Sequence, residues 1–264
     1  YDLKIFLLSF PIILSNLSRV LMSVVDVAMV GRLGTEALAA TGMGSMMFWG
    51  ALSLAIGIRT AVQTVTARRL GQGLFKESGT ALRNGLVLAT SYSIPTSFFV
   101  WSYSDSLVRF FIEDPAATPL TRDYVSIVFL GLLFSSYSFV FQGFFTGIEK
   151  TKVHMKVTIV SNVLNVYLNA GFIYGSSGIQ DFFNEHLSNL SLISYLWGWV
   201  NFPALGVKGA AIATLISSFW MAAHYTASLL SKETKVKYSI FIFSFDSEMM
   251  KRQVRLALPQ GVQE

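Results

Sequence analysis

A carboxylate and a guanidinium interrupt the first long apolar stretch of this sequence. Asp26 lies in SVVDVAMVG and is the only acidic residue deep within an apolar run, and Arg19 precedes it by seven residues. A charged side chain at the centre of a bilayer costs about 3 kcal/mol or more, so such residues usually have a function or a specific partner. A carboxyl group in this setting can alternate between a bound proton, a bound Na⁺ and a bare charge. We therefore predict that Asp26 is a coupling site, in preference to a structural partner of a backbone group or an arginine.

Arg19 has two interpretations that the sequence leaves open. Two turns of helix bring Arg19 and Asp26 to nearly the same face, so both can line one cavity. Arg19 then either pairs with Asp26 in one state and binds an anionic part of a substrate, or forms a buried ion pair that fixes the first helix in the bundle. A second basic residue, Arg59 near the cytoplasmic end of the second apolar run, is predicted to extend toward the lipid headgroups.

Amide and hydroxyl side chains recur in the later apolar runs. Asn165 and Asn169 are one helical turn apart, so they are predicted to face protein or water and not lipid. Carboxamides can coordinate Na⁺, bind a substrate or join helices, and the residues alone favour none of these roles. The same ambiguity holds for Gln142 and Thr214. The last apolar run also has a ridge of small residues that predicts close helix packing, formed by Gly209, Ala213 and Ser217.

The elements that must position these side chains are long apolar helices. The 264 residues are 53% hydrophobic and 13% charged, with a mean hydropathy of +0.54, whereas soluble proteins have about 25% charged residues. Each apolar run is long enough to cross about 30 Å of hydrocarbon as a helix. One run, 5–31, contains Arg19 and Asp26, and five are uncharged: 37–58, 84–104, 124–148, 157–180 and 209–231. We therefore predict an all-α, polytopic membrane protein with a lobe of six transmembrane helices.

The basic residues predict the orientation and exclude several classes of function. With the N-terminus in the cytoplasm, 14 of the 20 Lys and Arg residues lie inside and 4 outside, a strong positive-inside bias. Topology and lipid headgroups explain these charges, so nucleic acid is not an expected partner. The absence of cysteine excludes disulfides and thiolate metal sites. No HExxH, GxSxG, phosphate-loop or GxGxxG motif occurs, so we expect neither an enzyme nor a cofactor or metal.

The end of the sequence suggests a fragment with an internal repeat. The chain stops at Glu264, shortly after Pro259, just as a new apolar run begins. In the strings LLSFPIILS and RLALPQGVQ, apolar residues precede a proline that lies a few residues into a predicted helix. This similarity predicts the first helices of two repeats, a common plan in secondary transporters. We divide the chain into three parts: a six-helix lobe at 1–231, a cytoplasmic linker at 232–253 and the start of a seventh helix at 254–264.

The outer segment 176–203 is unusually long and has no assigned role. Its aromatic residues Tyr195, Trp197 and Trp199 are predicted to anchor at the membrane interface. A lid or re-entrant element is the alternative.

Several segments together resemble the multidrug and toxic compound extrusion (MATE) transporters. From Pro11 to Gly34, with VVDVAMVGRLGTEALAA after the proline, the sequence is similar to the first helix and outer loop of that family. Further matches follow in order: TARRLGQG, FQGFFTGIEKTK, NVLNVYLN, GVKGAAIATLIS and LPQGVQE. The resemblance covers nearly the whole chain and is strongest to the DinF-like branch. It implies one lobe of a twelve-helix, two-lobe protein, monomeric at full length and located in a bacterial inner membrane.

The resemblance also implies residue roles. Pro11 corresponds to a helix bend that changes with protonation, and Asp26 corresponds to the coupling residue. The implied pocket consists of Arg19, Gln142, Asn165, Asn169 and Thr214. Two features depart from the family pattern. Asn169 stands where the DinF-like branch often has Asp, which favours H⁺ over Na⁺ because hard cations prefer charged oxygen ligands. Arg19 adds a positive charge that a simple organic-cation pocket would avoid, so an anionic or zwitterionic substrate stays open.

We therefore predict a secondary antiporter that exports organic, multidrug-type compounds in exchange for H⁺ or Na⁺, with the lipid bilayer and a C-terminal lobe as its partners. One alternative is a flippase for a lipid-linked or anionic amphipathic substrate, favoured if Arg19 and Arg59 both face the lumen of the lobe. An alternative of another class is a non-transporting membrane interaction module, favoured if the natural protein ends near Glu264. An intramembrane enzyme would need a second catalytic group close to Asp26.

Overall fold

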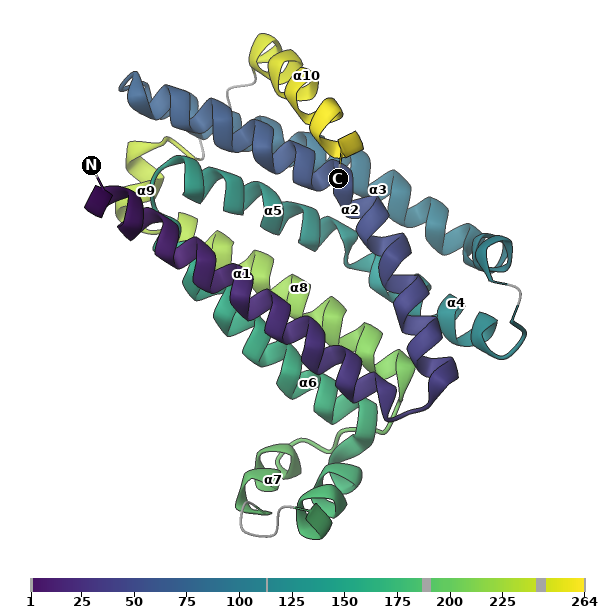
Figure 1. Ribbon diagram of the computed structural model, residues 1–264. Coiled ribbons are helices and arrows are strands. Elements are labelled where there is room, and N and C mark those ends of the chain that lie inside the picture. The colour runs from purple at the N-terminus through teal and green to yellow at the C-terminus, as the bar shows by residue number, and fades with distance from the viewer. Residues whose placement is uncertain (1, 113, 187–190, 241–245, 264) are drawn as a thin grey trace.

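Long helices form almost all of the structure. The computed structural model describes residues 2–112, 114–186, 191–240 and 246–263, and the regular elements in these ranges are α-helices (Figure 1). In chain order they are α1 (Asp2–Gly31), α2 (Thr35–Gly71), α3 (Phe75–Phe111), α4 (Ala117–Leu130), α5 (Leu132–Gly147), α6 (Thr151–His186), α7 (Ser191–Gly198), α8 (Val207–Leu229), α9 (Lys232–Lys237) and α10 (Ser247–Gln263). The predicted all-α class is confirmed.

Five of the six predicted spans coincide with one long helix each, and the sixth is divided. The run 124–148 forms α4 and α5, which meet at Gly131 with a bend of 49°. A Cβ at Gly131 would lie 3.2 Å from the Leu215 side chain, so the bend brings this backbone close to α8. α2, α3 and α6 extend beyond their uncharged runs at both ends, whereas α8 ends two residues before its run does.

Length and hydropathy alone identify part of this bundle as membrane-spanning. The helical segments Leu8–Gly31, Thr35–Gly71 and Thr151–Glu185 are long and apolar enough to cross a bilayer, and the bent pair α4 and α5 is a fourth candidate. The described parts of α3 and α8 are not among these segments. They pack within the same bundle, and their membrane crossing stays a prediction from the sequence.

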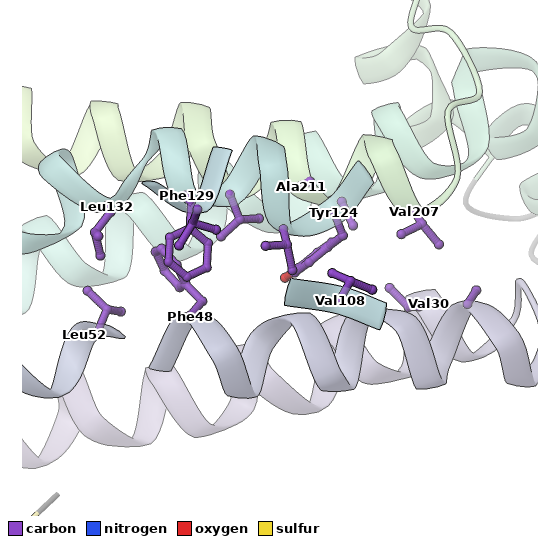
Figure 2. Close-up of a cluster of buried hydrophobic side chains, with 14 of the residues drawn as sticks. Val30, Phe48, Leu52, Val108, Tyr124, Phe129, Leu132, Val207 and Ala211 are labelled. Atoms are coloured by element: carbon purple, nitrogen blue, oxygen red, sulfur yellow. The ribbon is translucent and has the colours of Figure 1, made fainter. Parts of the chain in front are cut away.

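The core lies between two groups of helices. In Figure 1, α1, α6 and α8 run side by side, and α2, α3 and α5 lie along the other side of the bundle. A buried apolar cluster joins the two groups, with Phe48 packed edge-on against Phe129 at a centroid distance of 5.5 Å (Figure 2). Leu132 and Tyr124 belong to the same cluster, so the bent α4–α5 pair supplies much of the contact between the groups.

The small-residue ridge of α8 packs closely on α6, as the sequence predicts. A Cβ at Gly209 would overlap the Phe172 carbonyl oxygen, and Ala213 is fully buried. Ser217 differs from these two, because it lines a cavity inside the bundle. The ridge therefore fixes α8 against α6 near the end where the chain enters α8.

The described residues of the segment 176–203 are mostly helical. α6 continues to His186 past a break at Gly175, whose φ of 75° favours glycine, and α7 follows. Trp197 Nε1 donates a hydrogen bond to the Tyr167 carbonyl at 2.8 Å, and the two rings stack at 5.2 Å. Trp197 therefore packs against α6, whereas Tyr195 and Trp199 are 63% and 90% exposed. The interfacial anchoring of these aromatics stays a prediction.

The segment after α8 docks on α3. Arg83 Nη1 donates a hydrogen bond to the Ser239 carbonyl at 2.7 Å, and the buried Gln253 Nε2 donates to the Ala81 carbonyl at 2.9 Å. α10 lies across α2 and α3 in Figure 1. The helix that contains the predicted 254–264 segment begins earlier, at Ser247. The proposed division into lobe, linker and seventh helix stays a prediction.

Candidate functional site

Asp26 is held by an amide from a second helix. Asn169 Nδ2 on α6 donates a hydrogen bond to Asp26 Oδ1 at 2.6 Å and approaches Asn165 Oδ1 at 2.9 Å. Asn165 and Asn169 are both buried, and their one-turn spacing places them on one face of α6, as predicted. A chain of polar contacts therefore links the coupling candidate on α1 to the interior face of α6.

Two adjoining cavities surround this contact. We name them by the predicted orientation. The inner cavity, of about 230 Å³, extends toward the turn between α5 and α6, and the outer cavity, of about 340 Å³, extends toward the turn between α1 and α2. Gln142 and Asn165 line the inner cavity, and Asn169 lines the outer one. Five residues line both: Arg19, Asp26, Trp49, Leu52 and Thr214. The structure thus gathers the whole predicted set of site residues except Pro11 around these two cavities.

Arg19 faces the cavities without a carboxylate partner. It forms no hydrogen bond or ion pair with another residue in the described part of the chain, and no Arg19–Asp26 ion pair within 4.0 Å is present there. Asp26 is the one carboxylate among the described residues that line either cavity. The interpretation of Arg19 as half of a buried ion pair therefore does not hold in this structure.

A buried histidine with polar partners lines the inner cavity. It was not identified as a site residue from the sequence. His154 on α6 is 1% exposed; its Nε2 lies 3.1 Å from Gln142 Nε2 and its Nδ1 lies 2.6 Å from the Tyr225 hydroxyl. Because an amide nitrogen only donates, this arrangement makes His154 Nε2 the acceptor and leaves the proton on Nδ1. The helical spacing could have identified His154, because it lies on the same face of α6 as Asn165 and Asn169.

The Arg59 side chain contacts an aromatic ring of α5, and its predicted extension toward the lipid headgroups stays a prediction. Its guanidinium is over the Phe139 ring, with Cζ 5.8 Å from the centroid, and the residue is half-buried. α2 continues to Gly71, so Arg59 is about three turns inside the helix end and extends sideways into the bundle. Phe139 lines the inner cavity but Arg59 does not.

Pro11 lies inside the continuous helix α1. The Ser15 hydroxyl donates a hydrogen bond to the Pro11 carbonyl at 2.7 Å, and both residues are buried. Proline has no backbone N–H, so one helical hydrogen bond is absent at this point. The structure therefore shows a weakened site in α1, and a bend that changes with protonation stays a proposal.

The arrangement is suited to proton and ligand binding. No group of three or more His, Cys, Asp or Glu residues with metal-binding geometry occurs within the described ranges. Chemically, the site offers one carboxylate that can take a proton and one guanidinium that can take an anion, at the boundary between two cavities. Trp49 and Leu52 add apolar surface beside them.

Comparisons with known proteins give a family match and several relatives. The sequence profile of the MatE family matches residues 11–170. The probable multidrug resistance protein NorM of Mesorhizobium japonicum is 25% identical over 257 residues, which cover 96% of this chain and 50% of that protein. The protein of the same name from Photorhabdus laumondii is 32% identical over 173 residues, covering 66% of this chain and 38% of that protein.

Solved structures share the fold. An outward-facing multidrug resistance MATE family transporter of the MOP superfamily superposes with a TM-score of 0.81 at 24% identity, covering 98% of this chain and 52% of that one. A MATE structure in the bent conformation gives a TM-score of 0.78 at 25% identity, again covering 98% and 52%. The chain spans about half the length of the curated relatives it matches.

Proposed function

Because this chain belongs to the MatE family of membrane transporters, we propose that it is the N-terminal lobe of a secondary antiporter. In this proposal the protein exports multidrug-type organic compounds in exchange for H⁺ or Na⁺, with Asp26 as the coupling residue. It is a multi-pass protein of the bacterial inner membrane with a cytoplasmic N-terminus, belongs to the DinF-like branch and acts as a monomer. A second lobe completes the path for the substrate.

The observation that carries the proposal is the position of Asp26. Its carboxylate lies on the wall shared by the inner and outer cavities and accepts a hydrogen bond from Asn169. A group at this boundary can receive a proton from one side of the membrane and lose it to the other. In this proposal proton and substrate are bound alternately at this site, which couples their movements.

The contacts of Asn169 support H⁺ in preference to Na⁺. Its Nδ2 approaches the Asp26 carboxylate at 2.6 Å, where an N–H donor occupies space that a bound cation would need. Its Oδ1 is buried and has no hydrogen-bond partner among the described residues. Rotation of the amide would present Oδ1 to a protonated Asp26, so Asn169 can serve both protonation states. Hard cations prefer several charged oxygen ligands, and these cavities supply one carboxylate.

The proposed cycle uses the weak point in α1. Asp26 takes a proton from the outside, α1 bends near Pro11, the cavities contract and the bound compound leaves. Deprotonation toward the cytoplasm then restores the first state. Asn165 and Thr214 keep the carboxyl oriented in this cycle, and Arg19 and Gln142 contact the substrate.

Gradient-driven transport by the full-length protein in proteoliposomes tests this function. Export of a panel of fluorescent organic dyes is measured under a pH gradient and then under a Na⁺ gradient, for wild type, Asp26→Asn and the control Asp105→Asn. Asp105 is an exposed residue near the outer end of α3, paired with Arg109 at 2.8 Å. We expect the pH gradient alone to drive export, Asp26→Asn to abolish it and Asp105→Asn to retain it. If neither gradient drives export, the coupling assignment is wrong.

A flippase for a lipid-linked or anionic amphipathic substrate is the second candidate, and Arg19 is the observation in its favour. Arg19 faces both cavities, but Arg59 lies over Phe139 outside the lining. The flippase interpretation requires both arginines to face the lumen of the lobe, and only Arg19 does so. Movement of a fluorescent pyrophosphate lipid between leaflets of the same proteoliposomes, without any gradient, would favour the flippase over the antiporter.

A further inference from the structure

We propose that the two central cavities bind amphipathic zwitterions, with the anionic group of the ligand against Arg19 and its ammonium group against Asp26. This inference rests on the proposed exchange function and names its class of substrate. It starts from Arg19, which lines both cavities and has no hydrogen-bond or ion-pair partner among the described residues. A guanidinium inside a membrane protein is expected to face an anion or water, and no described carboxylate in these cavities is paired with it.

The spacing of the two charges sets the shape of the ligand. Arg19 and Asp26 are two turns apart on α1, an axial separation of about 10 Å. Apolar surface lies around them: Trp49 and Leu52 line both cavities, and Phe139 lines the inner one. A ligand that matches these apolar side chains and both charges has a flat apolar body with opposite charges near its two ends.

The requirement for exchange selects among three ligand charges. A simple anion is attracted by Arg19 and repelled by ionised Asp26, so it binds best when Asp26 is protonated. Anion and proton then bind together, which gives co-transport and not exchange. A simple cation competes with the proton at Asp26, as exchange requires, but Arg19 repels it. A zwitterion competes with the proton through its ammonium group and neutralises Arg19 with its anionic group.

The other titratable groups around the cavities do not supply an alternative anion site. Tyr124 of α4 lines the outer cavity, and His154 of α6 and Tyr225 of α8 line the inner one. His154 and Tyr225 bond to each other at 2.6 Å, and the tyrosine hydroxyls are neutral near pH 7. From α2, Arg59 lies over Phe139. Arg19 and Asp26 are therefore the charges that a ligand in these cavities meets directly.

Three probes of one fluorescent aromatic skeleton test the proposal with the full-length protein. The zwitterion carries a carboxylate and an aliphatic amine about 10 Å apart, its methyl ester is a cation, and its N-acetyl derivative is an anion. Binding is titrated in detergent for wild type, Arg19→Gln and Arg19→Lys. Arg32→Gln is the matched control, because Arg32 follows α1 directly but lines neither central cavity.

We expect wild type to bind the zwitterion about 10- to 100-fold more tightly than the ester, the range of one charge-assisted hydrogen-bonded contact. Arg19→Gln should remove this preference, because it should weaken binding of the zwitterion and leave binding of the ester unchanged or tighter. Arg19→Lys should retain much of the preference, and Arg32→Gln all of it. The comparison of probes on wild type needs no substitution, so it stands even if an Arg19 variant fails to fold.

Equal binding of ester and zwitterion by wild type would overturn the proposal, as would an Arg19→Gln protein that binds both as wild type does. The exchange function is judged separately in proteoliposomes. Export of the ester driven by a pH gradient and lost in Asp26→Asn would keep the exchange function while the zwitterion class fails. Binding of the zwitterion that depends on Arg19, without gradient-driven movement of any probe, would support the ligand class and overturn the exchange.

Discussion

Gly209→Ala tests whether the backbone contact between α6 and α8 holds the site together. A Cβ at Gly209 would overlap the Phe172 carbonyl oxygen and lie 3.0 Å from the Ile173 nitrogen. These neighbours are backbone atoms, so no side chain can rotate away to make room. The added methyl group must therefore push α8 from α6 at its outer end, five residues before Thr214.

The structure gives the size of the effect. Overpacking a closely packed contact costs about 1–3 kcal/mol, and an alanine in a helix recovers less than about 1 kcal/mol of this through its better helix propensity. In a domain of this size, 1 kcal/mol corresponds to a shift of about 2–4 °C in Tm. Because the overlap is with backbone atoms, we take the upper half of this cost, which leaves a net loss of about 1–2 kcal/mol. We therefore expect Gly209→Ala to lower the Tm by about 2–8 °C.

Thermal unfolding of the full-length protein in detergent, followed by tryptophan fluorescence, measures this shift. Gly50→Ala is the matched control, because Gly50 is also helical and an added Cβ there meets no atom within 4 Å. It should unfold at the wild-type temperature or slightly above it. A Gly209→Ala protein with the same Tm as Gly50→Ala would refute the close contact between α6 and α8.

Three further predictions separate polar contacts that function from those that only hold helices together. Asn169→Ala removes the donor to Asp26 and should lower pH-driven export about tenfold or more, the effect of one lost charge-assisted hydrogen bond, while the amount of folded protein stays near wild type. Asn162→Ala removes a 2.8 Å hydrogen bond to α1 and should lower stability by about 1 kcal/mol, with the pH profile of export unchanged. Glu233→Gln breaks an exposed 3.0 Å ion pair with Lys150 and should change stability by less than about 1 kcal/mol in a thermal melt.

The helices were predictable because their signals are local. Uncharged runs of sufficient length predicted the long helices, and the one-turn spacing of Asn165 and Asn169 predicted their common face. The shared surroundings of Arg19 and Asp26 followed from their two-turn spacing on a single helix. In each case the relevant residues lie in one element, so helical geometry alone related them.

Features that depend on contacts between distant segments were not predictable. The bend at Gly131 reflects the approach of α8, and hydropathy alone treats 124–148 as one span. The hydrogen bond from Asn169 to Asp26 joins α6 to α1, and no local pattern relates those helices. Two partners of His154 come from α5 and α8, so the sequence around the histidine does not identify them.

The pH dependence of ligand binding by wild type and Asp26→Asn is the most direct test of the central claim. The zwitterionic probe is titrated against the full-length protein between about pH 5.5 and 8, with Asp105→Asn as control and proton release followed by an indicator dye. Because ligand and proton compete for Asp26, wild type and Asp105→Asn should bind more tightly as the pH rises and release protons on binding. Asp26→Asn should show neither effect. The same pH dependence and proton release in Asp26→Asn as in wild type would contradict the assignment of Asp26 as the coupling residue.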